Sequence, residues 1–322
     1  MPKLITRIFG GLGNQLFIYA TAKALAARTG AELVLDTKTG FRRDAYQRQF
    51  ALHCFDIQYR EANALERFDF PAGKIARFIL RRANRHLPLR HRFYLTEKKH
   101  TERFPNVDYS LKTGYSKRYF IPELMSFKPT GRTWLEGYWQ SPRYFENIRE
   151  TLTHELTVQG QLSPETMRVA EQIQTSDSVC VHLRLSRNIV AGKEIATGKQ
   201  LDWQHYIQCM DFVAQQIENP RFFCFSDNPE AAQKLSSLPY EIVLVSHNKG
   251  DERAHEDFYL MSLCRHFILS NSTFGWWPAW LNTNPDSMVI SPPVHFWDNK
   301  DILPSGWVTS DQLSERTSDA PV

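Results

Sequence analysis

The chain has 322 residues, of which 42% are hydrophobic and 23% charged, as is typical of a globular protein with a packed core. No apolar run reaches the ~18–20 residues of a membrane-spanning helix, and Met1–Ile5 lacks the apolar segment of a signal peptide. The five cysteines are scattered without a CxxC pair, which argues against a disulfide framework and a cysteine-ligated zinc site. We therefore expect a cytoplasmic protein with reduced thiols.

The net charge of +4 is unevenly distributed along the chain. Between Pro71 and His100 there are nine Lys or Arg residues and one Glu, so this window alone carries +8. Nucleic-acid-binding proteins more often spread basic residues over a whole domain face, and we therefore expect no nucleic-acid partner. A local cluster favours contact with a single anionic group instead.

The N-terminal segment predicts a β-α-β unit. Leu4–Phe9 is expected to form a buried strand, Gly10–Gly13 a tight turn and Asn14–Thr29 a helix with apolar residues at helical spacing. Gly30 occupies the position where a left-handed C-cap is expected, and Ala31–Leu35 predicts the next strand.

The middle of the chain, roughly 41–130, is irregular, basic and rich in aromatic residues. Within it, 74–87 predicts a helix with an apolar stripe. The stripe consists of Ile75, Phe78, Ile79 and Ala83, and the basic residues Arg77, Arg81, Arg82 and Arg85 lie beside or opposite it. One interpretation is a helix that packs its stripe in the core and exposes a solvated basic face.

From Ser178 onward, strands and helices alternate again. Strands are predicted at Val179–Leu185, Phe222–Phe225, Ile242–Val245, Phe267–Leu269 and Met288–Ile290. Helices are expected to begin after the N-cap candidates Asp202, Asn228, Asp251 and Asn271, and a further helix is expected at Ser163–Ile173. Such alternation predicts parallel sheets covered on both faces, and hence an α/β fold of two units. We place the N-terminal domain, with its basic aromatic insertion, at 1–155 and the C-terminal domain at 156–322.

The first candidate site is the turn Gly10-Gly11-Leu12-Gly13-Asn14-Gln15, which lies between a strand and a helix. Backbone N–H groups and the helix dipole at such a turn favour an anion. The third glycine of GxGxxG is missing, and no GK[ST] follows. The turn is therefore either a close-packing device or a site where the amides of Asn14 and Gln15 bind sugar hydroxyls.

The second candidate site is the end of the strand that contains His182 and Arg184. In open parallel sheets, ligands bind beyond the carboxyl ends of the strands, and alternation puts these two side chains on one face. The guanidinium of Arg184 suits a diphosphate, and a neutral imidazole suits a base or a ribose. The alternative is an ion pair between Arg184 and a neighbouring carboxylate.

The third candidate site is Ser270-Asn271-Ser272-Thr273, at a strand-to-helix turn. An N-cap needs only one such residue, so the run favours a second phosphate-binding helix N-terminus. Two such turns and Arg184 together suggest a nucleoside diphosphate ligand. No Asp-x-Asp pair is present, so we expect no metal, and the leaving diphosphate would be stabilised by Arg184 and backbone N–H groups.

These motifs, in this order, resemble those of the bacterial and animal α-1,2-fucosyltransferases, glycosyltransferase family eleven. The landmarks that carry the resemblance are the glycine turn with Leu16, Phe17, Tyr19 and Ala20, then Gly137-Tyr138-Trp139-Gln140-Ser141, His182-Leu183-Arg184, Phe225-Ser226-Asp227-Asn228, Asp257 with Leu260-Met261-Ser262, and Ser270 to Trp277. The resemblance implies two Rossmann-like domains facing a cleft, in a GT-B-like fold. It also implies inverting, metal-independent transfer of fucose from GDP-fucose to the 2-hydroxyl of a galactoside, in surface glycan or O-antigen synthesis.

The resemblance further implies roles for individual residues. Arg184 would neutralise the β-phosphate in catalysis and Asn14 would lie near the fucose, while His182 and Asp257 would read the guanine edge. The other residues expected to bind the donor are Gly11, Gly13, Asp227, Ser270, Asn271, Ser272 and Thr273. The general base stays open between the diphosphate oxygens, Asp36 and Glu136.

One segment departs from the family pattern. The family reads His-x-Arg-Arg-Gly-Asp-Tyr, whereas this chain has His182-Leu183-Arg184-Leu185-Ser186-Arg187-Asn188 and keeps only the first Arg. A catalytically impaired sugar- or nucleotide-binding relative is therefore one alternative. Another is an NAD-dependent Rossmann oxidoreductase, for which Asp36 is suitably placed but Gln15 stands where a third glycine is needed.

The resemblance also bears on the acceptor, which we expect to be a galactoside-terminated oligosaccharide. Bacterial members of the family often act on lipid-linked oligosaccharides at the inner membrane face. There the basic segment 74–92 would be attracted to an acceptor diphosphate and to anionic lipids, at ~1 kcal/mol per Lys or Arg. This second interpretation predicts a cytoplasmic enzyme that binds the inner membrane face peripherally.

Overall fold

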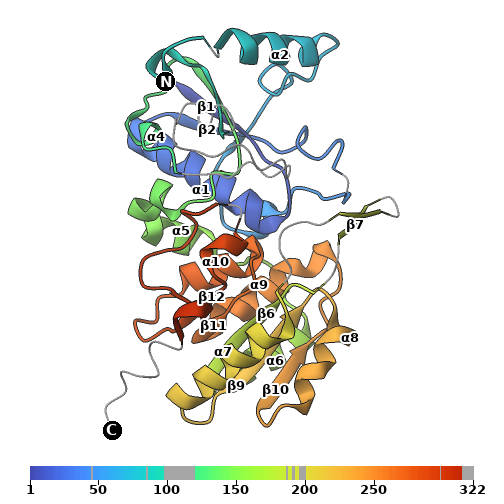
Figure 1. Cartoon of the computed structure of the whole chain (residues 1–322). Helices are drawn as coiled ribbons and strands as arrows, with labels where there is room; N and C mark the ends of the chain where they lie inside the picture. The colour runs from blue at the N-terminus through green and yellow to red at the C-terminus, as the bar shows by residue number, and fades with distance from the viewer. Residues whose placement is uncertain are drawn as a thin grey trace. The chain divides into compact units, whose positions relative to one another are not determined.

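The computed structural model describes residues 1–44, 46–84, 86–97, 120–185, 188–190, 193–195, 201–297 and 299–313. By its internal contacts the chain forms two units. Unit 1 comprises Met1–Leu156 with Asp298–Ile302, and unit 2 comprises Thr157–Trp297 with Leu303–Val322. Each unit contains one large parallel sheet with helices (Figure 1), so the predicted α/β architecture is confirmed. The sequence predicted two domains, each formed by one continuous segment, and did not predict that the chain returns to unit 1 near residue 300.

The sheet of unit 1 has five parallel strands in the order β3-β2-β1-β5-β4. Its strands are β1 (Lys3–Arg7), β2 (Glu32–Asp36), β3 (Arg60–Glu61), β4 (Tyr94–Thr96) and β5 (Arg132–Glu136). Its helices are α1 (Leu12–Thr29), α2 (Gly73–Asn84), α4 (Glu123–Ser126) and α5 (Arg149–Glu155), with 3-10 turns η1 (Leu52–Cys54), η2 (Leu89–His91), η3 (Pro142–Tyr144) and η4 (Glu146–Ile148). The middle segment is thus less irregular than predicted, since it supplies β3, β4 and α2.

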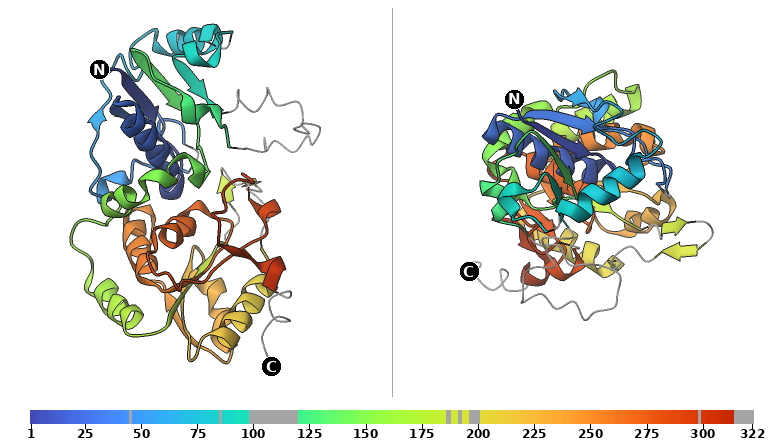
Figure 2. Two further views of the ribbon diagram at one scale, coloured as in Figure 1. Left: turned by 90° about the vertical axis from the view of Figure 1, so that its left-hand side faces the viewer. Right: turned by 90° about the horizontal axis from the view of Figure 1, so that it is seen from above.

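The first β-α-β unit forms as predicted. Helix α1 lies along the sheet (Figure 2) and is buried over most of its length. The side chains of Leu16, Phe17 and Tyr19 are completely buried. Gly30 ends the helix with φ +67°, a left-handed conformation that glycine adopts without a Cβ clash. The next strand follows at Glu32, one residue after the predicted start.

Helix α2 contradicts the expectation of a core-packed apolar stripe. The side chains of Ile75, Phe78 and Ile79 are 64%, 65% and 57% exposed. Arg77 and Arg81, by contrast, turn toward carboxylates at the edge of the sheet. The predicted amphipathic helix therefore forms, but its apolar face is exposed and its basic face points toward the sheet.

The sheet of unit 2 has six parallel strands in the order β10-β9-β6-β11-β12-β13. Its strands are β6 (Ser178–Leu183), β9 (Arg221–Ser226), β10 (Glu241–Val245), β11 (His266–Ile268), β12 (Val289–Ser291) and β13 (Val308–Thr309), with a separate antiparallel pair β7 (Asn188–Val190) and β8 (Lys193–Ile195). Its helices are α6 (Pro164–Gln174), α7 (Trp203–Gln216), α8 (Pro229–Ala232), α9 (Ala254–Leu263) and α10 (Thr273–Leu281), with 3-10 turns η5 (Gln233–Ser237), η6 (Asp251–Arg253), η7 (Val294–Phe296) and η8 (Ser310–Gln312). The five strands predicted here are all present within one or two residues.

The caps of the unit 2 helices agree only in part with the prediction. The side chains of Asp202 and Asn228 each accept a backbone N–H three residues later, so these two caps are confirmed. Asn271 is not the cap of α10, because Ser272 accepts the N–H of the first turn instead. Asp251 starts a 3-10 turn that precedes α9 and does not cap that helix.

The core of unit 2 lies on both faces of its sheet. In β6, Val179, Val181 and Leu183 point into the cluster that α7 covers, whereas Cys180 points into the cluster beneath α6, α9 and α10. All five cysteines are free thiols, and four of them are buried. Within the described part of the chain, no helix is long and apolar enough to cross a membrane.

Candidate functional site

The carboxyl edge of the unit 2 sheet collects most of the polar residues that the sequence singled out. His182 is the penultimate residue of strand β6, Asp227 directly follows β9, and Ser270 lies two residues after β11. Asp257 lies on α9, and α10 begins at Thr273. In parallel α/β sheets this edge is where ligands bind. Each element therefore delivers its polar residue to the end of the sheet where binding is expected.

His182 is buried at this edge, where it contacts Ser270 and lies close to Gly275. Its Nδ1 lies 3.1 Å from the hydroxyl oxygen of Ser270. Burial lowers the pKa of His182 to about 4, so the imidazole is neutral at pH 7. A Cβ on Gly275 would lie 2.4 Å from that Nδ1, so only glycine lets helix α10 approach the ring this closely. The site thus presents an uncharged imidazole, which suits hydrogen bonding more than charge neutralisation.

Arg184 forms an ion pair with Asp227, as one of the two sequence interpretations anticipates. The Nε atom of Arg184 lies 3.2 Å from Oδ2 of Asp227, and Oδ1 of Asp227 accepts the N–H of Leu185 at 2.7 Å. One carboxylate therefore fixes both the backbone and the guanidinium just beyond β6. The Arg184 side chain is 39% exposed, so the pair lies at the surface of the edge.

Asp257 is the most perturbed carboxylate of the site. Burial raises the pKa of Asp257 to about 7, and Asn248 Nδ2 donates to its Oδ1 at 2.8 Å. The Oδ1 atom of Asn248 is buried and has no hydrogen-bond partner among the described residues. A half-charged carboxylate beside an unsatisfied amide oxygen is characteristic of a ligand site. Asn248 was missed by the sequence reasoning, although it follows strand β10 at the same edge.

The neighbouring Glu256 has a different role. Its carboxylate accepts the N–H and the hydroxyl of Ser163 at 3.1 and 2.7 Å and pairs with Arg253. Burial alone would raise the pKa of Glu256, but hydrogen bonds from Thr166, Ser163 and Arg253 lower it to about 2. Glu256 therefore ties α6 to α9, and the two adjacent carboxylates of α9 have separate functions.

The run that begins at Ser270 is partly structural. The hydroxyl of Ser270 contacts His182, Asn271 Nδ2 donates to the carbonyl of Phe296 at 3.2 Å, and Ser272 caps α10. These bonds hold the first turn of α10 at the carboxyl edge of the sheet. The helix N-terminus, and not a row of free hydroxyls, is what this run offers to a ligand.

In unit 1, the glycine turn is built around Gln15. Its Nε2 donates to the carbonyls of Gly10 at 2.9 Å and Gln49 at 2.8 Å, and its Oε1 accepts the N–H of Ala51 at 2.9 Å. With 1% exposure and both polar atoms occupied, Gln15 holds two loops together, so its interpretation as a sugar-binding amide is wrong. Asn14 has a different partner from Gln15: its Oδ1 accepts a hydrogen bond from Nε2 of Gln140 at 2.7 Å.

This bond joins the glycine turn to the segment Gly137–Ser141. Glu97, which is buried, accepts the N–H of Tyr138 at 2.8 Å and of Trp139 at 3.2 Å. Trp139 has φ +56°, and its buried Nε1 has no hydrogen-bond partner in the described part of the chain. The sequence reasoning missed Glu97, which directly follows strand β4 and shapes this turn.

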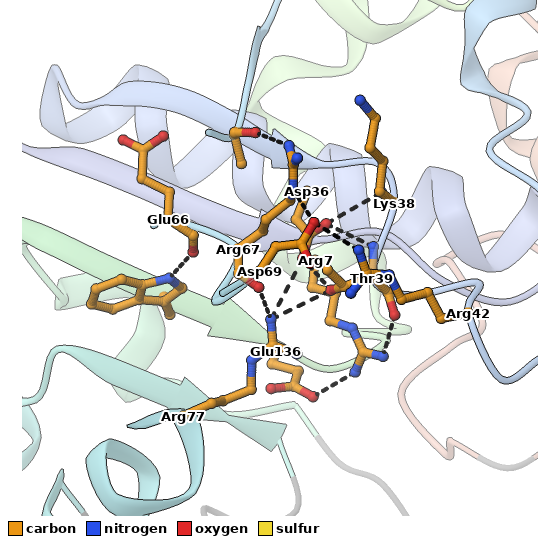
Figure 3. Close-up of polar contacts among 12 residues, drawn as sticks. Arg7, Asp36, Lys38, Thr39, Arg42, Glu66, Arg67, Asp69, Arg77 and Glu136 are labelled. Carbon is orange, nitrogen blue, oxygen red and sulfur yellow. Dashed lines mark hydrogen bonds and ion pairs between the residues drawn. The ribbon is translucent and has the colours of Figure 1, made fainter. Parts of the chain in front are cut away.

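The two carboxylates named as alternative general bases are both engaged (Figure 3). Asp36 accepts the N–H of Thr39 at 2.9 Å and the hydroxyl of the same residue, and it lies 3.6 Å from Arg77 Nη2. It therefore closes the turn after β2 and is not presented for binding a ribose. This observation weighs against both the oxidoreductase alternative and Asp36 as a base.

Glu136 is held at the end of β5 by three partners. Arg7 Nη1 lies 3.1 Å and Arg81 Nη1 3.7 Å from its Oε1, and the Tyr94 hydroxyl donates to its Oε2. Although burial alone would raise it, these cations and the tyrosine hold the pKa of Glu136 below its ordinary value. A carboxylate stabilised in this way is a poor proton acceptor. The chain departs from the family pattern at Leu185–Asn188, and of these four residues Ser186 and Arg187 lie outside the described residues.

The chain contains two parallel α/β units. Polar residues cluster at the carboxyl edge of the sheet in unit 2 and around the glycine turn in unit 1. This arrangement is typical of α/β proteins that bind a ligand. Comparison with known proteins makes the assignment specific. The family model described as glycosyl transferase family 11 matches residues 3–310, so the chain belongs to this family and is a glycosyltransferase. Membership excludes the oxidoreductase alternative.

Two relatives from Escherichia coli match most of the chain. An α-1,2-colitosyltransferase is 26% identical over 317 residues, covering 96% of this chain and 99% of the relative. The O-antigen biosynthesis glycosyltransferase WbnK is 26% identical and covers 90% and 94% respectively. Among solved structures, the fucosyltransferase NodZ from Bradyrhizobium is 14% identical with a TM-score of 0.49, covering 88% of this chain and 94% of that one.

Proposed function

We propose that the protein transfers fucose from GDP-fucose to the 2-hydroxyl of a galactoside, with inversion and without a metal. The observation that carries the proposal is that the carboxyl edge of unit 2 holds both a neutral His182 and a buried Asp257 that is hydrogen-bonded to Asn248. Membership of glycosyl transferase family 11 and the α-1,2-specific relatives support it.

The guanine end of the donor is assigned to Asp257. Guanine presents an N1–H and an exocyclic amine on the same edge, and an ionised carboxylate accepts both. The unsatisfied Oδ1 of Asn248 offers a further acceptor. Binding of these donors stabilises the charged form of Asp257, which burial disfavours. His182, being neutral, would bond the ribose or the base.

The diphosphate is assigned to Arg184 and the N-terminus of α10. As the bond from fucose to the diphosphate breaks, negative charge builds on the β-phosphate, and a fixed cation and N–H groups stabilise it. Asp227 acts through Arg184, since it anchors the guanidinium at Nε. The sugar itself is assigned to Asn14, in the glycine turn that also contains Gly11 and Gly13. No step in this scheme requires a metal.

The proton of the acceptor hydroxyl needs a destination. Asp36 and Glu136 are held by cations and hydroxyls, which weakens both as bases. Of the three alternatives, the diphosphate oxygens therefore fit best. In this scheme the 2-hydroxyl oxygen attacks the anomeric carbon from the face opposite the diphosphate, and the bond from that carbon to the diphosphate breaks. The proton of the hydroxyl leaves to water on the acceptor side, and the released GDP takes up a proton from water. The acceptor would be a galactoside-terminated oligosaccharide, carried on a lipid in the cell.

A colitose donor is the second candidate. It is favoured by the α-1,2-colitosyltransferase that matches this chain over 96% of its length. A donor that carried colitose on the same nucleoside diphosphate would differ from GDP-fucose only in its sugar, so the guanine site would not discriminate between the two.

The test is incubation of the full chain with a β-galactoside and either GDP-fucose or the colitose donor. We expect GDP release that depends on the acceptor, and a product whose new linkage is α-1,2 by NMR. Equal activity after treatment with EDTA is expected. Tight GDP binding without any transfer would instead identify a catalytically impaired relative, and a different linkage would overturn the acceptor assignment.

A further inference from the structure

Helix α2 of unit 1 is attached to its sheet by polar side chains. Asn84 Oδ1 accepts the N–H groups of Phe93 and Tyr94 at 2.7 and 3.0 Å. Arg77 Nη2 donates to the carbonyl of Arg67 at 2.8 Å, beside Asp36 (Figure 3). Arg81, one turn on, pairs with Glu136. The residues 77, 81 and 84 recur at helical spacing, so the inner face of α2 is its polar face.

The outer face of α2 is apolar and exposed. Ile75, Phe78 and Ile79 have the i, i+3, i+4 spacing of one stripe and are each more than half exposed. Leu65 and Phe70, in the segment that leads into α2, are also exposed, at 63% and 37%. Most of the exposed large hydrophobic side chains of the described residues thus lie within this short segment. Such a concentration on one surface marks an interaction site.

Every charged residue in the segment that contains this stripe is basic. No Asp or Glu occurs from Pro71 to Thr96. Lys74 and Arg82 lie on α2 itself and are exposed beside the stripe, and Arg90 is exposed beyond the helix. Figure 1 shows α2 at the periphery of unit 1, and among the described residues of that unit the side chains of Ile75, Phe78 and Ile79 remain exposed. We call the surface formed by Lys74, Ile75, Phe78, Ile79 and Arg82 the α2 face.

We propose that the α2 face docks on an anionic lipid bilayer. The helix would lie in the plane of the interface, with its three apolar side chains at the acyl boundary and the two cations against the headgroups. Positive charge around an exposed apolar stripe is complementary to such a surface. A second copy of the chain fits less well, since like charges would face each other and three side chains fall far short of the ~800 Å² per partner of a stable interface.

This proposal corrects the earlier role of the basic segment 74–92. Arg77 and Arg81 are committed to carboxylates of their own unit and are not headgroup ligands. Replacing them would loosen α2 and would not report on lipid binding. The proposal rests on exposure and charge, and it stands whether or not the proposed sugar transfer is correct.

The test is flotation of the full chain with vesicles of phosphatidylcholine, either alone or mixed with phosphatidylglycerol. We expect binding to the mixed vesicles at low salt, weaker binding at physiological salt, and none to the neutral vesicles. The triple change Ile75→Ser, Phe78→Ser and Ile79→Ser should lower the partition coefficient at least about tenfold. Lys74→Gln and Arg82→Gln should each lower it about fivefold.

Matched controls separate docking from folding and from charge alone. Lys128→Gln with Arg132→Gln removes two exposed cations of the same unit away from α2 and should leave flotation unchanged. The triple variant should keep the wild-type melting temperature and its activity on a small soluble acceptor. Failure of the wild type to bind mixed vesicles at low salt would overturn the proposal. So would dimerisation in light scattering that the triple variant abolishes, which would assign the α2 face to a second copy.

Discussion

Replacing Asp257 with Asn should stabilise the unliganded protein and weaken its binding of GDP. Burial raises the pKa of Asp257 to about 7, from about 3.9 for an exposed aspartate. Three pKa units at ~1.4 kcal/mol each correspond to at most about 4 kcal/mol of folding stability lost at neutral pH. Asn keeps the oxygen that accepts from Asn248 but carries no charge.

The pH dependence follows from where the proton is bound. Below about pH 4 the carboxyl is protonated in the folded and the unfolded chain, so Asp and Asn differ little. Between about pH 4 and pH 7 the folded chain keeps a proton that the unfolded chain has lost, and the stability of the wild type falls with rising pH. The advantage of Asp257→Asn should grow over this range and then level off. Each kcal/mol corresponds to about 2–4 °C in the melting temperature of a unit of this size.

GDP affinity should behave in the opposite way. Because the ionised carboxylate accepts the guanine donors, calorimetric titrations of the wild type should show affinity rising up to about tenfold per pH unit between about pH 5 and 7. Asp257→Asn should bind GDP more weakly and without this dependence. Glu256→Gln is the control on the same helix: it should lower the melting temperature at about pH 8 and keep the pH-dependent affinity. A destabilised Asp257→Asn variant, or a wild-type affinity independent of pH, would refute the reasoning.

Three further outcomes are expected. Arg184→Ala should lower turnover by about 10²–10³-fold, with Arg184→Lys restoring only part because the planar fork is lost, and near-normal kinetics of the Ala variant would contradict the diphosphate assignment. Transfer should persist in excess EDTA, and a loss that Mg²⁺ or Mn²⁺ reverses would show that a metal is needed. The bond to Arg60 lowers the pKa of buried Glu66 to about 2, so Glu66→Gln should cost about 3 kcal/mol near pH 7, a difference that thermal melting should show shrinking from about pH 4.5 down to pH 2.

Unit 2 was predictable because its strands are apolar on both faces. In β6, Val179 and Val181 enter one core and Cys180 the other, so the strand appears as a continuous apolar run typical of a central parallel strand. The end of that run locates His182 at the carboxyl edge, and Ser270 follows in the same way from β11. Residues at strand ends can thus be grouped from sequence when the strands themselves are unmistakable.

The inverted helix α2 was not predictable in this way. Periodicity identifies the stripe around Phe78, but it does not indicate which face points inward. That choice is made by Asp36 and Glu136, which lie more than 40 residues away in sequence and attract Arg77 and Arg81. Two ion pairs to carboxylates that are largely buried orient the helix, and neither can be inferred from the local sequence.

The roles of amide side chains could not be predicted from sequence in either unit, because they depend on distant neighbours. Asn14 and Gln15 are adjacent and equally polar, yet only Gln15 is enclosed by the carbonyl of Gln49 and the N–H of Ala51. Asn248, a lone amide in a loop, gains its significance from Asp257 on another element. Side-chain roles of this kind depend on tertiary neighbours, which a single sequence does not specify.

The return of the chain to unit 1 has a consequence for the order of synthesis. Asp301 accepts the N–H of Phe120 at 2.8 Å and pairs with Arg143, so residues made late complete a unit begun at the N-terminus. On a ribosome that adds about 5–20 residues per second, Leu156 precedes Asp301 by about 7–30 s. During that interval the nascent first unit holds Arg143 without its carboxylate partner. A fragment ending at Leu156 would remain in that incomplete state permanently.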